Sequence, residues 1–313
     1  MSQAVEARSP AWGLIGVLGL LGAAWGMGQP LTKIAVSTGH GPWGLIFWQF
    51  LTGALVLALI QLVRRRPVPL ARGDVQVYAV IALLGTLLPM AASFIAYRHL
   101  PAGIMSILIS MVPMLAFPIA LALGADRFSW VRLGGLSLGL AGVALLILPQ
   151  GGLAMPNALG WVLLGMVAPT FYAIEANYVG HCGVRGMGAM QVLHGASWVG
   201  AGMSLPVALA TGQMFIPGGD PRADGALIAA SVLHVFAYSG YVWLVGRAGS
   251  TFAAQCAYLV TGFGVLWAML LLGERYSGWA WGAMALVLCG LALVQPRPKL
   301  APGAAANLGP GDQ

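Results

Sequence analysis

Long apolar runs fill most of this chain, and they restrict the solvent in which it can fold. Residues 100–123 carry no charge, and the next run, residues 130–146, carries only Arg132 near its start. Of the 313 residues, 59% are hydrophobic and 7% are charged, whereas a soluble domain carries about 25% charged residues. A chain this apolar has too little polar surface to face water, so we expect it to fold in a lipid bilayer.

Ten apolar segments are long enough to span a membrane, because a helix needs about 20 apolar residues to cross it. The sequence therefore predicts an all-α polytopic membrane protein with ten transmembrane helices. The first segment is too long for the apolar core of a signal peptide, so we interpret it as a spanning helix. Residues 297–313, rich in Pro, Gly and Ala, are expected to form a disordered cytoplasmic tail. The ten segments cover about residues 11–36, 43–63, 75–97, 101–123, 130–148, 158–180, 188–211, 223–245, 251–272 and 277–294.

The second half of the chain repeats the first at an offset of 148 residues. This shift places residues 126–129, Asp-Arg-Phe-Ser, on residues 274–277, Glu-Arg-Tyr-Ser, and it also places Gly142 on Gly290. Each copy holds five helices, and because five is odd the second copy must lie upside down relative to the first. The sequence therefore predicts two inverted five-helix repeats, residues 1–150 and 151–296.

Most basic residues fall on one side of the predicted bundle. With the N-terminus on that side, it holds eleven of the 15 Lys and Arg residues. Positively charged residues stay cytoplasmic, so we expect both termini inside the cell and a place in the bacterial inner membrane. The residues on this side are Arg8, Arg64, Arg65, Arg66, Arg72, Arg127, Arg132, Arg185, Arg247, Arg297 and Lys299.

These features resemble the drug/metabolite transporter superfamily of the EamA type, which has ten helices in two five-helix repeats. The family's repeat opens with a Trp-Gly pair, which Trp25-Gly26 matches, whereas residues 171–173, Phe-Tyr-Ala, depart from it in the second half. In the ninth helix Thr261 replaces a family proline. The fourth-helix pattern of small residues and proline is matched by Gly103, Ser106, Ser110 and Pro113. The resemblance covers nearly the whole chain, and it implies transport, with export of amino acids or related metabolites more common than import.

The expected function is a secondary transporter of small metabolites or drug-like amphiphiles that works by alternating access. Inverted repeats place a cavity between the two halves near the middle of the membrane. The sequence has no Gly-x-x-x-x-Gly-Lys-Ser/Thr loop, so we do not expect ATP to drive transport, and we expect no cofactor. The basic residues form no patch interleaved with aromatic residues, so nucleic acid is not an expected partner. The expected partners are a small-molecule substrate, the lipid bilayer and protons as the coupling ion, for a monomer or homodimer.

Two other classes of function compete with transport. The first is a membrane sensor or scaffold that moves no solute and docks a partner on its basic inner loops. The second is an intramembrane metal enzyme, in which Glu175, His194 and His234 would converge on a metal ion. The chain has no zinc-protease or serine-protease motif, so we expect neither catalysis nor a metal site. The three cysteines, which have no metal or disulfide spacing, are interpreted as packing residues: Cys182, Cys256 and Cys289.

Glu175 is the one acid that the sequence places inside a membrane span. A charged side chain at a helix centre costs about 2.5–3.5 kcal/mol, so such residues usually face a cavity or a partner. His194 lies at a similar depth on the following helix. The two could form a pair that binds a cationic group of a substrate or relays a proton. The alternative is that Glu175 reaches the cytoplasmic interface or pairs with Arg185.

Several further side chains are candidates for substrate contact or proton coupling. Neutral polar groups inside apolar runs either line a pathway or bond to a neighbouring helix, and the second use is the commoner. Aromatic residues away from helix ends either line a cavity or pack in the core. The polar candidates are His234, Gln29, Gln49 and Gln255, and the aromatic candidates are Trp25, Tyr172 and Tyr258.

Overall fold

The computed structural model describes residues 12–147 and 156–294 of the chain. The first half of the described chain contains α1 (Trp12–Ala35), η1 (Val36–Thr38), α2 (Pro42–Arg64), α3 (Arg72–Ala82), η2 (Leu83–Leu87), α4 (Leu88–His99), α5 (Ala102–Ile109), α6 (Val112–Ala122) and α7 (Trp130–Ile147). The second half contains α8 (Ala158–Gly165), α9 (Val167–Cys182), α10 (Ala189–Ala210), α11 (Pro221–Ala248), α12 (Ser250–Ala254), α13 (Cys256–Leu272) and α14 (Gly278–Val294). The predicted tail, residues 297–313, and the predicted boundary at residue 150 lie outside the described residues.

The described elements confirm an all-α polytopic membrane protein. Nine of the described helical segments are long and apolar enough to cross a membrane, and several of them join short helices into one span. Thus α3, η2 and α4 form the span Arg72–His99, and α8 with α9 forms Ala158–Cys182. The last helix, α14, is apolar but shorter, with 17 residues. At about 1.5 Å rise per residue it nearly spans the apolar layer, which makes ten an approximate count.

Two spans are broken where a proline removes a backbone donor. Pro113 cannot donate an amide hydrogen to the carbonyl of Ile109, the last residue of α5. Pro169 likewise cannot bond to Gly165, the last residue of α8. The helices therefore end at the residues that lose their partners, and each restarts within one turn.

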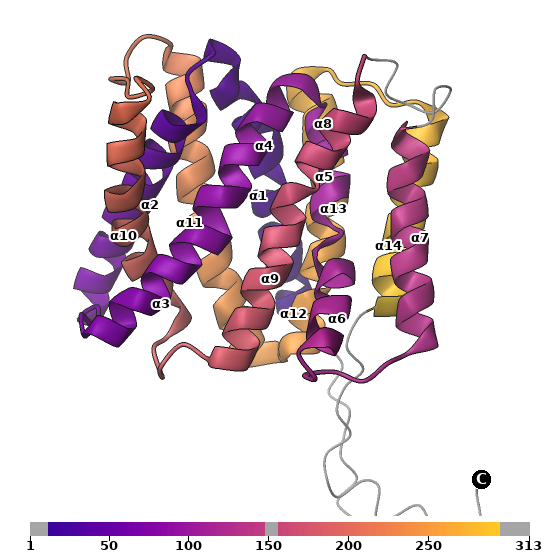
Figure 1. Cartoon of the computed structure of the whole chain (residues 1–313), viewed down its shortest axis with the longest axis horizontal. Coiled ribbons are helices and arrows are strands. Elements are labelled where there is room, and N and C mark those ends of the chain that lie inside the picture. Colours follow the sequence, from indigo (N-terminus) through magenta and orange to yellow (C-terminus); the bar gives the residue numbers. More distant parts are fainter. Residues whose placement is uncertain (1–11, 148–155, 295–313) are drawn as a thin grey trace, which may run out of the picture.

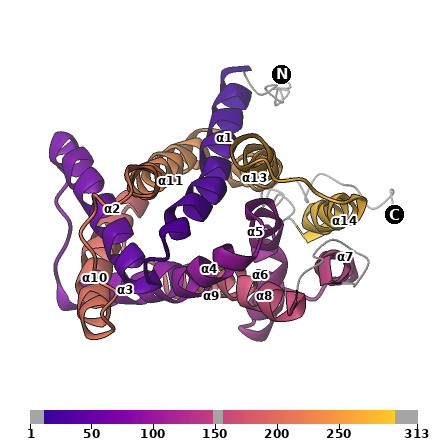
Figure 2. The same ribbon diagram turned by 90° about the horizontal axis from the view of Figure 1, so that it is seen from above.

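The helices stand side by side and form a closed outline when viewed from above (Figure 2). In Figure 1, α2, α3 and α10 lie on the left, while α7 and α14 lie together on the right. Between them α1 packs against both α11 and α13, and α4 packs against α9. Each repeat therefore contributes helices to every part of the bundle, which brings residues from both halves to the middle.

The contact between α7 and α14 relates the two halves by a two-fold pattern. A Cβ on Gly135 would lie 2.7 Å from the carbonyl oxygen of Gly290, and a Cβ on Gly142 would lie 2.8 Å from that of Ala283. At the repeat offset, Gly142 corresponds to Gly290 and Gly135 to Ala283. Gly135 therefore meets the repeat equivalent of Gly142, and Gly142 meets the repeat equivalent of Gly135. Glycine permits this close approach, as it does in many membrane helix pairs.

We call the end of the bundle that holds the end of α2 and the start of α3 the inner end, and the opposite end the outer end. An ion pair fixes the inner end, where the Arg185 Nε donates to the Asp74 Oδ1 at 2.7 Å. Asp74 lies in the first turn of α3, and Arg185 follows α9. The pair thus ties the two repeats together at this end.

The ion pair is expected to stabilise the fold modestly, because the Arg185 side chain is 53% exposed and solvent screens it. In a double-mutant cycle with Asp74→Asn and Arg185→Gln, we expect a coupling free energy of roughly 0.5–1 kcal/mol in reversible unfolding from detergent micelles. The matched control pairs Asp74→Asn with Arg66→Gln, an exposed arginine near the same end. Equal coupling in the two cycles would contradict a specific pair.

Candidate functional site

Glu175 lies on α9 with its carboxylate against a π-helical turn. That turn is η2, between α3 and α4, and a Cβ on its Gly85 would lie 2.6 Å from the Glu175 Oε1. Only glycine at this position leaves space for the carboxylate where it stands. Short π-helical segments inside α-helices are frequent at functional sites. The fold thus provides a specific place for the acid inside the span.

Two phenols share the surroundings of this carboxylate. Glu175 interacts electrostatically with Tyr172, about one turn earlier on α9, and with Tyr238 on α11. These two helices have different neighbours: α9 packs on α4 and α6, whereas α11 packs on α1 and α2. The acid therefore lies near phenols from two different helices, α9 and α11.

Next to Tyr238, the first and eighth spans meet through two predicted site residues. The Trp25 Nε1 donates to the His234 Nδ1 at 3.2 Å, although 209 residues separate them. The rings of His234 and Tyr238 stack with centroids 6.3 Å apart. Because the Nδ1 accepts a hydrogen bond, the neutral imidazole carries its proton on the Nε2, and the side chain is exposed. We call Trp25, Tyr172, Glu175, His234 and Tyr238 the central cluster.

His194 makes its hydrogen bond within its own helix. Its Nε2 accepts a hydrogen bond from the Trp198 Nε1 at 3.0 Å on the same helix, α10, and its Nδ1 is buried without a partner. The helix α10 packs mainly on α2 and α3, and it also touches η2, the turn that Glu175 lies against. In the described part of the chain, no hydrogen bond or ion pair joins Glu175 to His194, and Arg185 pairs with Asp74 instead.

The remaining candidates occupy varied surroundings. Gln29 is buried and accepts a hydrogen bond from the Tyr97 hydroxyl, which is a bond between neighbouring helices. The Gln49 Oε1 is buried without a partner, and Gln255 is exposed at the turn between α12 and α13. Tyr258 is partly buried and packs against the main hydrophobic core. Of these four side chains, none joins the central cluster through a hydrogen bond within the described residues.

The outer end carries a network that sequence reasoning did not identify as a site. The Glu274 carboxylate accepts hydrogen bonds from the amides of Ala102 at 2.8 Å and Gly103 at 3.2 Å, and from the Tyr276 hydroxyl. Burial, and next the hydrogen bond to Glu274, raise the pKa of the Tyr276 phenol, so that it stays a donor. Lys33 on α1 donates to the carbonyl of Leu100 at 2.8 Å and interacts electrostatically with Glu274. Together these contacts join α1, α5 and the α13–α14 turn.

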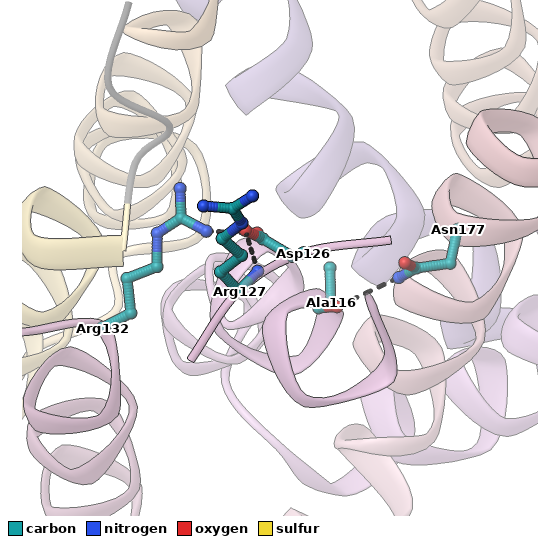
Figure 3. Close-up of polar contacts among 5 residues, drawn as sticks. All are labelled: Ala116, Asp126, Arg127, Arg132 and Asn177. Atoms are coloured by element: carbon teal, nitrogen blue, oxygen red, sulfur yellow. Dashed lines mark hydrogen bonds and ion pairs between the residues drawn. The ribbon is translucent and has the colours of Figure 1, made fainter. Parts of the chain in front are cut away.

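At the inner end the repeat equivalents make different contacts (Figure 3). The Asp126 carboxylate pairs with the Arg132 guanidinium and accepts from the amide of Arg127 at 2.8 Å. Nearby, the Asn177 amide donates to the carbonyl of Ala116 at 3.1 Å, which joins α9 to α6. The two ends of the bundle are thus held by chemically different contacts.

Within the described residues, no group of three or more His, Cys, Asp or Glu side chains is placed to hold a metal ion. The fold and the polar groups inside it define a polytopic helical membrane protein built from two inverted repeats. The chain belongs to the EamA-like transporter family, which matches residues 11–148 and 159–295.

Similarity to individual proteins agrees with this family. The chain is 22% identical over 300 residues to a probable terminal-alkyne amino-acid exporter of Streptantibioticus cattleyicolor, with 91% of this chain and 93% of that protein covered. A protein of known crystal structure superposes with a TM-score of 0.60 at 19% identity, and the match covers 88% of this chain and 94% of that one. At this identity the superposition supports the fold alone.

Proposed function

We propose that this protein is a secondary transporter that exports amino acids or related small molecules with an amino group, by alternating access between its two repeats. Both termini lie in the cytoplasm, and the membrane is the bacterial inner membrane. Family membership supports transport, and the name of the Streptantibioticus relative supports the amino-acid class. The basic residues around Arg64–Arg66 support the orientation.

One observation carries the substrate proposal, namely the Glu175 carboxylate held at Gly85 among the phenols of Tyr172 and Tyr238. A carboxylate beside aromatic rings suits a primary ammonium group, which forms charge-assisted hydrogen bonds and cation–π contacts. The exposed His234 supplies a donor for the carboxylate of the same molecule. The same acid can carry a proton when no substrate is bound, which would couple export to a proton gradient.

Counterflow in proteoliposomes tests this proposal. Vesicles loaded with one unlabelled amino acid at a time are diluted into its labelled form, with and without an imposed pH gradient. We expect uptake above empty liposomes for amino acids and amines, and no uptake for the corresponding deaminated carboxylic acids. Uptake of the acids alone would contradict the role of Glu175 in substrate binding.

A sensor or scaffold that moves no solute remains the competing function. It predicts no flux for any compound and a partner bound at the inner loops. Broad amino-acid counterflow by the purified protein would exclude it, because a scaffold has no pathway for exchange.

A further inference from the structure

At the outer end of the bundle, a contact joins the two repeats. Pro101 precedes α5 and offers no side-chain cap, so the first amides of this helix lack a local partner. The Glu274 carboxylate, 172 residues away from Ala102, accepts from them instead. A carboxylate at a helix N-terminus is also favoured by the helix dipole. Glu274 therefore latches the second repeat to the first.

The repeat offset places Asp126 on Glu274, and residues 250–251 on residues 102–103. A symmetric contact would put the Asp126 carboxylate on the backbone amides at residues 250–251. These residues begin a long helical segment, because α12 leads into α13 through the single turn residue Gln255. Among the described contacts, the Asp126 carboxylate instead pairs with Arg132.

Helix packing also differs between the two ends, as the contacts of Glu274 and Asp126 do. At the outer end, α5 packs against both α1 and α13. The repeat equivalents of these elements are α12, α9 and α6. In the described part of the chain, α12 packs on α11 and α13 but makes no comparable contact with α9 or α6. Within the described residues, the contacts that α5 makes at the outer end therefore have no equivalent at α12 on the inner end.

We propose that Glu274 and Asp126 are reciprocal gate residues, which hold the outer and the inner end closed in alternate states. In the present state Glu274 caps α5, and Asp126 forms an ion pair with Arg132. In the opposite state Glu274 releases α5, and Asp126 leaves Arg132 for the backbone amides at residues 250–251. This inference rests on the proposed transport function, because only an alternating-access cycle requires both states.

Glu274 and Asp126 have different residues at the equivalent positions around them. The position equivalent to Arg132 in the second repeat is Ala280, so no arginine competes for Glu274 in the same way. Conversely, the position equivalent to Tyr276 is Phe128, which lacks the hydroxyl that supports Glu274. The Arg132 guanidinium also lies over the Phe117 ring, 5.6 Å from its centroid. Arg132 therefore stabilises the state in which Asp126 does not contact residues 250–251.

Spin-label distances in nanodiscs test the exchange without any solute, so a failed flux assay cannot be mistaken for a failed gate. The background carries Cys182→Ser, Cys256→Ala and Cys289→Ser. Labels are attached at the outer end through Arg98→Cys with Leu271→Cys. At the inner end they are attached through the repeat-equivalent pair, Gly246→Cys with Leu123→Cys. All four labelled positions are exposed.

Two substitutions should shift the populations in the same direction. Glu274→Gln weakens the hydrogen bonds from the first amides of α5, and Arg132→Gln removes the ion-pair partner of Asp126. For each, we expect the ratio of long to short outer distances to rise about tenfold, as the loss of charged hydrogen bonds implies. The ratio of long to short inner distances should fall by the same factor. Arg132→Lys, which keeps the charge, should restore most of the original ratio.

Matched controls separate the gates from general charge effects. Arg127→Gln removes the neighbouring arginine, whose backbone amide donates to Asp126. Asp224→Asn removes an outer-end acid in the first turn of α11, which accepts from the amide of Gly218. Neither control should change the ratio. The proposal is overturned if Arg132→Gln behaves like Arg127→Gln, or if the outer end opens while the inner distances stay fixed. Arg132 is partly exposed at the inner end, so its variant retains the fold even if Glu274→Gln does not.

Discussion

Glu175→Gln is expected to lower amino-acid counterflow by about 10- to 100-fold, because charged hydrogen bonds contribute about 1.5–3 kcal/mol each. The amide keeps the size of the side chain beside Gly85, so the loss would report charge and not shape. Counterflow with and without a pH gradient, measured on protein reconstituted in equal amounts, gives the result. A loss of gradient-driven accumulation with exchange retained would assign Glu175 to the proton alone.

Two further variants make the Glu175 experiment specific. Asp224→Asn removes an outer-end carboxylate and should leave counterflow unchanged. Gly85→Ala keeps the acid but places a Cβ 2.6 Å from its Oε1, so the carboxylate must move. We expect this variant to show a partial loss of transport. Full activity of both Glu175→Gln and Gly85→Ala would rule out a binding role for this acid.

Gly26→Ala is expected to destabilise the fold by about 1–3 kcal/mol, which is typical of overpacking. A Cβ there would lie 2.8 Å from the amide nitrogen of Gly264 and 3.0 Å from the carbonyl oxygen of Val260. Both are backbone atoms of α13, so no side chain can rotate to relieve the contact. Unfolding titrations in mixed micelles, monitored by tryptophan fluorescence, provide the measurement.

Gly28→Ala is the matched control for this position. It lies on the same helix, and a Cβ on Gly28 meets nothing within 4 Å. Alanine there should be neutral or slightly stabilising, because it favours the helix by roughly 1 kcal/mol. If both variants lose the same stability, close packing of α1 on α13 does not explain the glycine at residue 26.

The fold could be predicted because its causes repeat along the sequence. Apolar runs of the length of a bilayer defined the spans, and the breaks between α5 and α6 and between α8 and α9 follow directly from Pro113 and Pro169. The Trp-Gly pair has a physical explanation in the structure, since the Trp25 indole bonds to His234 while Gly26 lets α13 approach. These features depend on local residue types, which a sequence displays.

The site could be predicted only in part, because its geometry depends on distant partners. Glu175 was evident as an isolated charge, but nothing marked Gly85 among 45 glycines as its neighbour. His194 and Glu175 share a depth, yet within the described residues His194 bonds to Trp198 on its own helix and not to Glu175. Glu274 is bound by backbone amides, which every residue except proline carries and which leave no pattern in the side chains. Its one sequence signal is its alignment with Asp126.

The seam between α7 and α14 has a consequence for the origin of the chain. Gly135 meets Gly290 while Gly142 meets Ala283, so each surface is complementary to a copy of itself. Isologous symmetry of this kind is the hallmark of a homodimer. A single five-helix ancestor could therefore have assembled with an inverted copy of itself before the gene was duplicated and fused. Fusion then allowed each half to accumulate its own changes. One such difference is Arg132 in the first repeat with Ala280 at the equivalent position of the second, which two identical subunits could not have.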